Sequence, residues 1–193
     1  MTVELPREPP VWRSILFVPA LSERFVDSAL RQAADALQID LEDSIGPDDK
    51  QRAREAAPAV ARRFAEAGYD VIVRVNRPWR LLVRDLEAVV GAEVGAITLP
   101  KVPDAPFVRE VAQVLAELER EREMPAGHTR VIAMIESPDG LAHIDAIAAA
   151  HPRVAAIIVG AEDLASPLPV ARSMTTPCSR PTNSWCLLRA APA

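Results

Sequence analysis

Five short apolar runs in this sequence each end abruptly in charged or strongly polar residues. The runs cover residues 36–39, 71–73, 94–99, 131–135 and 154–159. Continuous apolar runs of this length are typical of strands in a parallel sheet, because helices cover both of its faces. In α/β folds the active-site residues follow the carboxyl ends of such strands. The polar residues after the five runs are therefore expected to share one rim of the sheet.

The residues delivered to that rim differ in chemistry and complement one another. They are Asp40, Glu42 and Asp43, then Arg74 and Asn76, then Lys101, then Glu136, and finally Glu162 and Asp163. Acids, a guanidinium, an amine and an amide gathered at one edge indicate an active site. A storage or scaffold protein has no need to collect them there.

Residues 13–19 predict a further strand at the start, and an amphipathic segment follows each strand. Helices are expected over residues 22–34, 48–67, 81–90, 103–123 and 138–149. The charged residues between 117 and 122 are expected to form a solvated face of the fourth helix. Strict alternation of strand and helix predicts a parallel sheet with right-handed crossovers. About six βα units are visible, up to Ser166.

The character of the sequence changes after residue 166, so we divide the chain into a domain of residues 13–166 and an atypical tail of residues 167–193. The tail is rich in Pro, Ser and Thr and holds both cysteines, Cys178 and Cys186, whose spacing matches no zinc or redox motif. Two interpretations stay open. The tail is either disordered or translated out of frame, since a shifted frame over residues 174–185 gives an amphipathic pattern.

Composition and motifs exclude several classes of function. A net charge of −5, without a basic stripe, argues against nucleic acid as a partner. No apolar run approaches the length of a membrane span, and the N-terminus lacks a signal-peptide pattern, so a cytoplasmic protein is expected. Glycine-rich phosphate loops are absent. None of the three histidines follows a strand, which disfavours a histidine base or metal ligand.

Glu136 and Asp163 follow two separate strands and are the first candidates for a metal site. Two carboxylates, with waters and a bidentate oxygen substrate, suit an octahedral Mg²⁺ ion. The alternative is that each acid caps the helix that follows it.

Arg74 offers a planar fork that can hold a substrate carboxylate in bidentate geometry. It can equally pair with the acids of residues 40–43. Those acids could order Arg74, Lys101 or the water shell of a metal, or serve only as structural partners. Lys101 could neutralise developing negative charge or be paired. Arg13 precedes the first strand, so it is expected at the opposite end or at an edge of the sheet.

Six segments, in order and at barrel spacing, resemble one family. They are RSILFVP, ALQIDLEDSIGPDDK, VIVRVN, ITLPKV, AMIESPDGL and VGAEDLA. The sequence from about residue 13 to 166 resembles the citrate lyase β-subunit family, the CitE-like branch of the HpcH/HpaI aldolase group. The resemblance implies a (β/α)8 barrel of the TIM type, incomplete here, and relatives that are homotrimers or hexamers. It also implies Mg²⁺-dependent cleavage or formation of a carbon–carbon bond in a 3-hydroxyacyl-CoA thioester, such as citryl-, malyl- or citramalyl-CoA.

Carried over by position, the resemblance makes Glu136 and Asp163 the metal ligands. It makes Arg74 the clamp on the substrate's carboxylate and oxo group, with Glu42 and Asp43 as acids around the metal-bound water.

Three other residues, and Glu136 again, belong to the predicted substrate site. The resemblance implies that Arg13 contacts substrate or coenzyme and that Lys101 lines the pocket, and Asn76 and Glu136 are predicted to bind substrate as well.

The sequence departs from the family after the sixth strand. A complete barrel needs strands seven and eight, and nothing after residue 166 resembles the family's C-terminal lid. We therefore expect that a lyase is encoded but that this chain is truncated and inactive. Two rival hypotheses remain: an aldolase that cleaves 4-hydroxy-2-oxoacids without coenzyme A, and a non-catalytic remnant of the scaffold.

Overall fold

A computed structural model describes residues 11–165 and 187–189 of the chain. Six parallel strands lie side by side in sequence order: β1 (Ile15–Pro19), β2 (Ala36–Asp40), β3 (Asp70–Arg74), β4 (Ala96–Leu99), β5 (Arg130–Ile135) and β6 (Val154–Val159). The predicted α/β class and strand order are confirmed. The sheet is not closed into a barrel within the described residues, because β1 forms one edge of it.

A short seventh strand lies at the other edge of the sheet. β7 (Leu187–Arg189) pairs antiparallel with β6. The sequence did not predict a strand in the tail, whose residues 167–186 and 190–193 lie outside the described residues, as do both cysteines.

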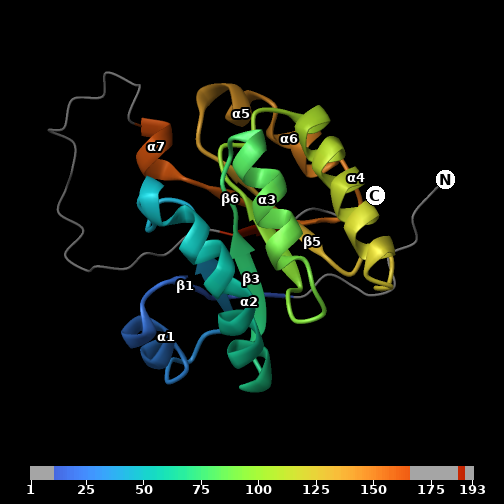
Figure 1. Cartoon of the computed structure of the whole chain (residues 1–193). Helices are drawn as coiled ribbons and strands as arrows, with labels where there is room; N and C mark the ends of the chain where they lie inside the picture. The colour runs from blue at the N-terminus through green and yellow to red at the C-terminus, as the bar shows by residue number, and fades with distance from the viewer. Residues whose placement is uncertain (1–10, 166–186, 190–193) are drawn as a thin grey trace, which may run out of the picture.

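Helices connect the strands and cover one face of the sheet. They are α1 (Glu23–Ala29), α2 (Lys50–Glu66) after the 3₁₀ turn η1 (Pro47–Asp49), α3 (Trp79–Val89), α4 (Ala105–Glu121), α5 (Pro138–Ala142), α6 (Ile144–Ala148) and α7 (Ala161–Ala165). Figure 1 shows α2, α3 and α4 following one another across the sheet. None of the described helices is both long and apolar enough to cross a membrane.

Two predicted helices differ from the observed ones. Ser22 caps α1 as expected, accepting a hydrogen bond from the backbone of Phe25, but the helix ends at Ala29. The predicted helix over residues 138–149 is split into α5 and α6 at His143. Close packing fixes the start of this segment, because a Cβ atom at Gly140 would lie 2.6 Å from the carbonyl oxygen of Val102.

Both faces of the strands are buried, which explains the continuous apolar runs. One face packs large aliphatic side chains such as Leu37, Val73 and Leu99 against the helices. The opposite face, which would line the barrel interior, combines alanines such as Ala36 and Ala96 with larger side chains such as Ile72. Successive residues of a strand alternate between the two faces.

The interior face becomes polar toward the carboxyl ends of the strands. Gln38 on β2 accepts a hydrogen bond of 2.6 Å from the hydroxyl of Thr98 on β4, and both are buried. Asp40 is the last residue of β2, two residues beyond Gln38, and Arg74 is the last residue of β3. The two residues are paired across the strands and lie on this same face. The alternation thus delivers an acid and a guanidinium to the rim.

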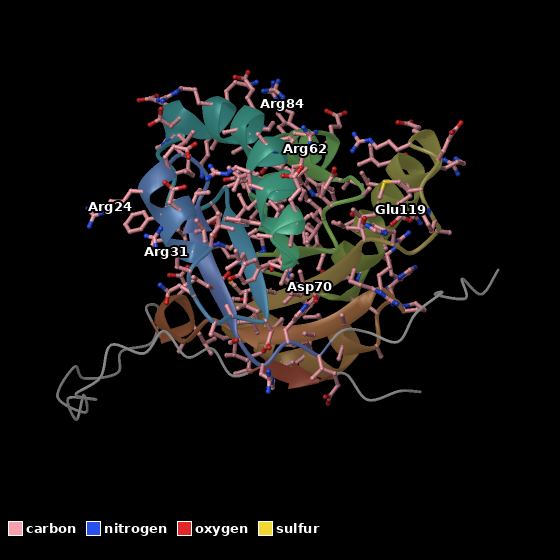
Figure 2. The ribbon with its side chains drawn as sticks, turned by 90° about the horizontal axis from the view of Figure 1, so that it is seen from below. Arg24, Arg31, Arg62, Asp70, Arg84 and Glu119 are labelled. Carbon is pink, nitrogen blue, oxygen red and sulfur yellow. The ribbon has the colours of Figure 1, made fainter. Side chains whose placement is uncertain are left out.

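The predicted solvated face of the fourth helix is wrong at Glu119, which is only 1% exposed. Glu119, labelled in Figure 2, accepts two hydrogen bonds of 2.6 Å from Arg153 and one of 2.8 Å from each of the backbone nitrogens of Gly127 and Thr129. The carboxyl-terminal end of α4 therefore packs against the residues that precede β5 and β6. Its partner Arg153 lies 34 residues away in sequence, which no local pattern indicates.

Candidate active site

An acidic turn, residues 40–43, follows β2 and surrounds Arg74. Asp40 accepts hydrogen bonds from the backbone nitrogens of Glu42 at 2.9 Å and Ser44 at 3.1 Å, which fixes the turn. Arg74 donates to both oxygens of Asp40 at 2.7 Å. Its Nη1 atom lies 3.1 Å from both Glu42 and Asp43. The ion pair that the sequence left open is therefore present, and the bidentate face of Arg74 is directed at Asp40.

The contacts between Arg74 and Asp40 favour the charged form of both side chains. Burial opposes the charge of Arg74, but the hydrogen bonds and charges of Asp40, Glu42 and Asp43 outweigh it and raise the pKa of Arg74 above its ordinary value. Burial likewise works to raise the pKa of Asp40, and the contacts with Arg74 lower it overall. Both groups are therefore ionised near neutral pH, and Arg74 is only 8% exposed.

Lys101 joins the acidic turn to the two predicted metal ligands. It follows β4 with a φ of 51°, the left-handed region that costs a residue with a side chain roughly 1–3 kcal/mol. Its backbone nitrogen donates to Glu136 at 2.9 Å. Its ammonium lies 2.9 Å from Glu42 and 3.6 Å from Asp163. One residue thus contacts acids from three separate βα units.

Glu136 follows β5 and lies against the turn that follows β6. It is 8% exposed. A Cβ atom at Gly160 would lie 2.5 Å from its Cγ and 2.9 Å from its Oε1, so only glycine leaves room for this side chain. Burial raises the pKa of Glu136, and the charge of Asp163 adds to that effect. The negative charge of Asp163 therefore acts on Glu136. Asp163, on α7, is the more exposed of the two acids.

These side chains fit a magnesium ion by the chemistry of their donors. Both are carboxylates, and Glu136 is desolvated beside a second negative charge, a situation that a bound cation relieves. Within the described residues, no group of three or more acidic, histidine or cysteine side chains is placed to hold a metal. Such a site would thus use two carboxylates and complete its shell with water or substrate oxygens.

A cavity of about 470 Å³ adjoins these residues at the rim. Its lining combines apolar and polar side chains: Glu42, Pro47, Lys50, Asn76, Arg77, Pro78, Leu81 and Lys101. Arg77 lies over the ring of Phe107, at 4.4 Å from its centroid. The cavity therefore extends from the Lys101 ammonium toward the amino-terminal ends of α2 and α3.

The sequence missed two residues that support this arrangement. Lys50, at the start of α2, donates to the carbonyl oxygens of Leu41 at 2.9 Å and Glu42 at 2.6 Å. These hydrogen bonds stabilise the backbone of the acidic turn. Asp85, in α3, accepts hydrogen bonds from Asn76. Lys50 lay inside the quoted ALQIDLEDSIGPDDK segment, but Asp85 lies in an amphipathic helix where an acid is normally solvent-exposed.

Arg13 does not lie with the other predicted site residues. It precedes β1, at the amino-terminal end of the sheet, and its side chain is 84% exposed. It pairs with Asp35 at 2.9 Å and holds the pKa of that acid at about 2. The geometry does not support a substrate contact from Arg13, so we leave it out of the proposed site.

Comparison with known proteins identifies the family. The model of the HpcH/HpaI aldolase/citrate lyase family matches residues 13–177. The citrate lyase subunit beta of Escherichia coli K12 is 35% identical over 164 residues, which cover 83% of this chain and 54% of that protein. The L-malyl-CoA/beta-methylmalyl-CoA lyase of Cereibacter sphaeroides is 34% identical over 161 residues, 80% of this chain and 49% of that one. The chain thus spans about half the length of the curated relatives it matches.

Solved structures agree with this assignment. The CitE protein of Mycobacterium tuberculosis, in complex with magnesium and pyruvate, superposes with a TM-score of 0.64 at 31% identity, over 86% of this chain and 62% of that one. A malate synthase of Haloferax volcanii, at 16% identity and a TM-score of 0.71, shares the fold alone. The resemblance seen in the six sequence segments is confirmed, and the chain belongs to the HpcH/HpaI aldolase/citrate lyase family.

Proposed function

We propose that this chain carries the metal and substrate site of a Mg²⁺-dependent carbon–carbon lyase that acts on a 3-hydroxyacyl-CoA thioester. The observation that carries the proposal is the convergence on Lys101 of Glu136, Asp163 and the acidic turn around Arg74. Relatives named citrate lyase subunit beta and malyl-CoA lyase support the thioester class. Structures of CitE with magnesium and oxaloacetate or pyruvate support the metal and a 2-oxoacid product.

Glu136 and Asp163 would hold the metal ion. When bound there, Mg²⁺ would stabilise negative charge on the substrate oxygen that becomes the oxo group. Lys101 keeps Glu136 in place through its backbone nitrogen and neutralises part of the charge on Asp163. Arg74 lies beside these acids, and because its Nε and Nη2 atoms donate to Asp40, it would act on the substrate carboxylate through its charge and not as a bidentate clamp.

Glu42 is the residue that we propose as the base in the cleavage direction. Burial raises the pKa of Glu42, and the charge of Asp43 adds to this, although Lys101 and Arg74 act in the opposite sense. Its Oε2 atom forms an ion pair of 3.1 Å with Nη1 of Arg74 but accepts no hydrogen bond from a described residue. A buried carboxylate with a raised pKa and an oxygen that accepts no hydrogen bond suits proton abstraction near neutral pH.

The proposed step balances with these groups alone. The proton of the 3-hydroxyl moves to Glu42, and the O–H electrons form the new C=O bond of the 2-oxoacid. The bond between C2 and C3 breaks, and its electrons pass to the thioester as an enolate. Transfer of the proton from Glu42 to C2 of that enolate gives the acyl-CoA product and restores the carboxylate.

The test is an assay of the purified chain with malyl-CoA and citramalyl-CoA, with and without Mg²⁺, in which acetyl-CoA and 2-oxoacid are quantified by mass spectrometry. The proposed site predicts Mg²⁺-dependent cleavage that Glu136→Gln and Asp163→Asn abolish, whereas the inactivity expected from the missing strands seven and eight predicts Mg²⁺ binding without turnover. Turnover of a 4-hydroxy-2-oxoacid but of neither thioester would instead favour the aldolase hypothesis. Absence of both turnover and Mg²⁺ binding would favour the non-catalytic remnant. Size-exclusion chromatography with light scattering would test the homotrimer or hexamer that the resemblance implies.

A further inference from the structure

Asp85 is a fully buried acid in α3 that links two helices to the end of β3. Its side chain has a relative exposure of 1%. One carboxylate oxygen accepts a hydrogen bond of 2.8 Å from Nε of Arg54 on α2. The other accepts from the backbone nitrogen of Asn76 at 2.8 Å and from its side-chain Nδ2 at 2.7 Å. Asp85 therefore contacts both the backbone and the side chain of a predicted substrate-binding residue.

These contacts determine which way the amide of Asn76 faces. Nδ2 uses both of its hydrogens, one on Asp85 and one on the carbonyl oxygen of Leu41 at 3.0 Å. The flipped amide would place its oxygen against two acceptors, which is unfavourable. Asp85, which is acceptor-only when ionised, thus fixes the orientation.

The fixed amide leaves its Oδ1 atom available as an acceptor. No described residue donates a hydrogen bond to it, and the atom is not fully buried. Asn76 lines the 470 Å³ cavity together with Glu42, Lys101 and the apolar side chains of Pro47 and Leu81. The cavity wall therefore carries a hydrogen-bond acceptor whose orientation is fixed by Asp85.

The geometry points to Asp85 as a positioning residue that fixes the Asn76 amide so that Oδ1 accepts a hydrogen bond from an uncharged donor, a hydroxyl or amide N–H, of the ligand in this cavity. An acceptor at this point selects such a donor and disfavours a carboxylate. The inference rests on the proposed function only in that the ligand is a thioester. It concerns orientation of the ligand and not the metal or the proton transfer.

The test uses Asp85→Asn, which keeps the shape but supplies a donor and so removes the reason for one amide orientation. Acetyl-CoA is the probe, and its affinity is measured by isothermal titration calorimetry in the presence of Mg²⁺. Loss of one hydrogen bond of this kind corresponds to an affinity about tenfold weaker. The side-chain NH₂ signals of Asn76 in ¹⁵N NMR, assigned by their loss in Asn76→Ala, should shift in Asp85→Asn.

Two controls separate positioning from a merely structural role. Glu119→Gln weakens another buried ion pair, at the far end of the strands, and should leave acetyl-CoA affinity unchanged despite reduced stability. In an Asn76→Ala background, Asp85→Asn should cause no further loss of affinity if it acts through Asn76. Equal losses in Asp85→Asn and Glu119→Gln, additive losses in the double variant, or a wild-type chain that does not bind acetyl-CoA would each overturn the inference. Failure of the proposed function is seen separately, as absent turnover with acetyl-CoA binding retained.

Discussion

Gly160 shows how tightly single residues constrain the candidate site. Its missing side chain leaves the space in which Glu136 lies, since a Cβ atom would come within 2.5 Å of the Glu136 side chain. We predict that Gly160→Ala displaces Glu136, weakens Mg²⁺ binding at least tenfold and lowers the free energy of unfolding by about 1–3 kcal/mol. Gly46→Ala is the matched control, because a Cβ atom there meets nothing within 4 Å. Unchanged Mg²⁺ affinity in Gly160→Ala would show that Glu136 is not a ligand.

The raised pKa of Glu136 predicts a pH dependence of stability. Burial favours the protonated carboxyl in the folded protein, so the folded state binds more protons than the unfolded chain above the ordinary Glu pKa. Stability therefore falls as the pH rises from that ordinary value through the raised one. Without Mg²⁺, Glu136→Gln should unfold at a higher temperature than wild type at pH 8, and the difference should vanish at pH 4. A variant less stable than wild type at pH 8 would contradict this.

Among the elements, α4 depends on one buried ion pair. Breaking such a pair by removing one partner costs about 3–5 kcal/mol, because the other charge is left buried. We predict a loss of this size for Glu119→Ala, measured by urea unfolding. Contacts with Arg153 and two backbone nitrogens outweigh burial and lower the pKa of Glu119, so this stability is present above the ordinary pKa and is lost as the pH falls through the lowered one. A loss below about 1 kcal/mol would show that Arg153 finds another partner.

Elements with local signals were predictable from the sequence, whereas long-range contacts were not. The strands were found because burial of both faces leaves continuous apolar runs, and α1 because Ser22 caps it. The site was predicted as a set because strand ends share a rim; Arg74, Lys101 and Glu136 do lie together there, and their role in a site stays a prediction. The left-handed backbone of Lys101 and the buried Asp85 depend on tertiary contacts, so no local pattern indicated them.

At the scale of the whole molecule, the edges of the sheet differ. β7 covers the edge of β6, while β1 forms the opposite edge. Unpaired strand edges offer hydrogen-bonding groups to other chains. Removal of residues 187–193 should therefore increase aggregation, measured by static light scattering at several protein concentrations. Scattering equal to that of the full chain would show that β7 does not protect β6.

The central claim is that acids from two βα units, Glu136 and Asp163, hold one metal ion beside Arg74. Isothermal titration calorimetry with Mg²⁺ tests it most directly, with wild type, Glu136→Gln and Asp163→Asn compared under the same conditions. The account predicts one Mg²⁺ per wild-type chain and an affinity at least about tenfold weaker in each variant, the effect expected when one ionised ligand is lost. Equal affinity in all three proteins would contradict it.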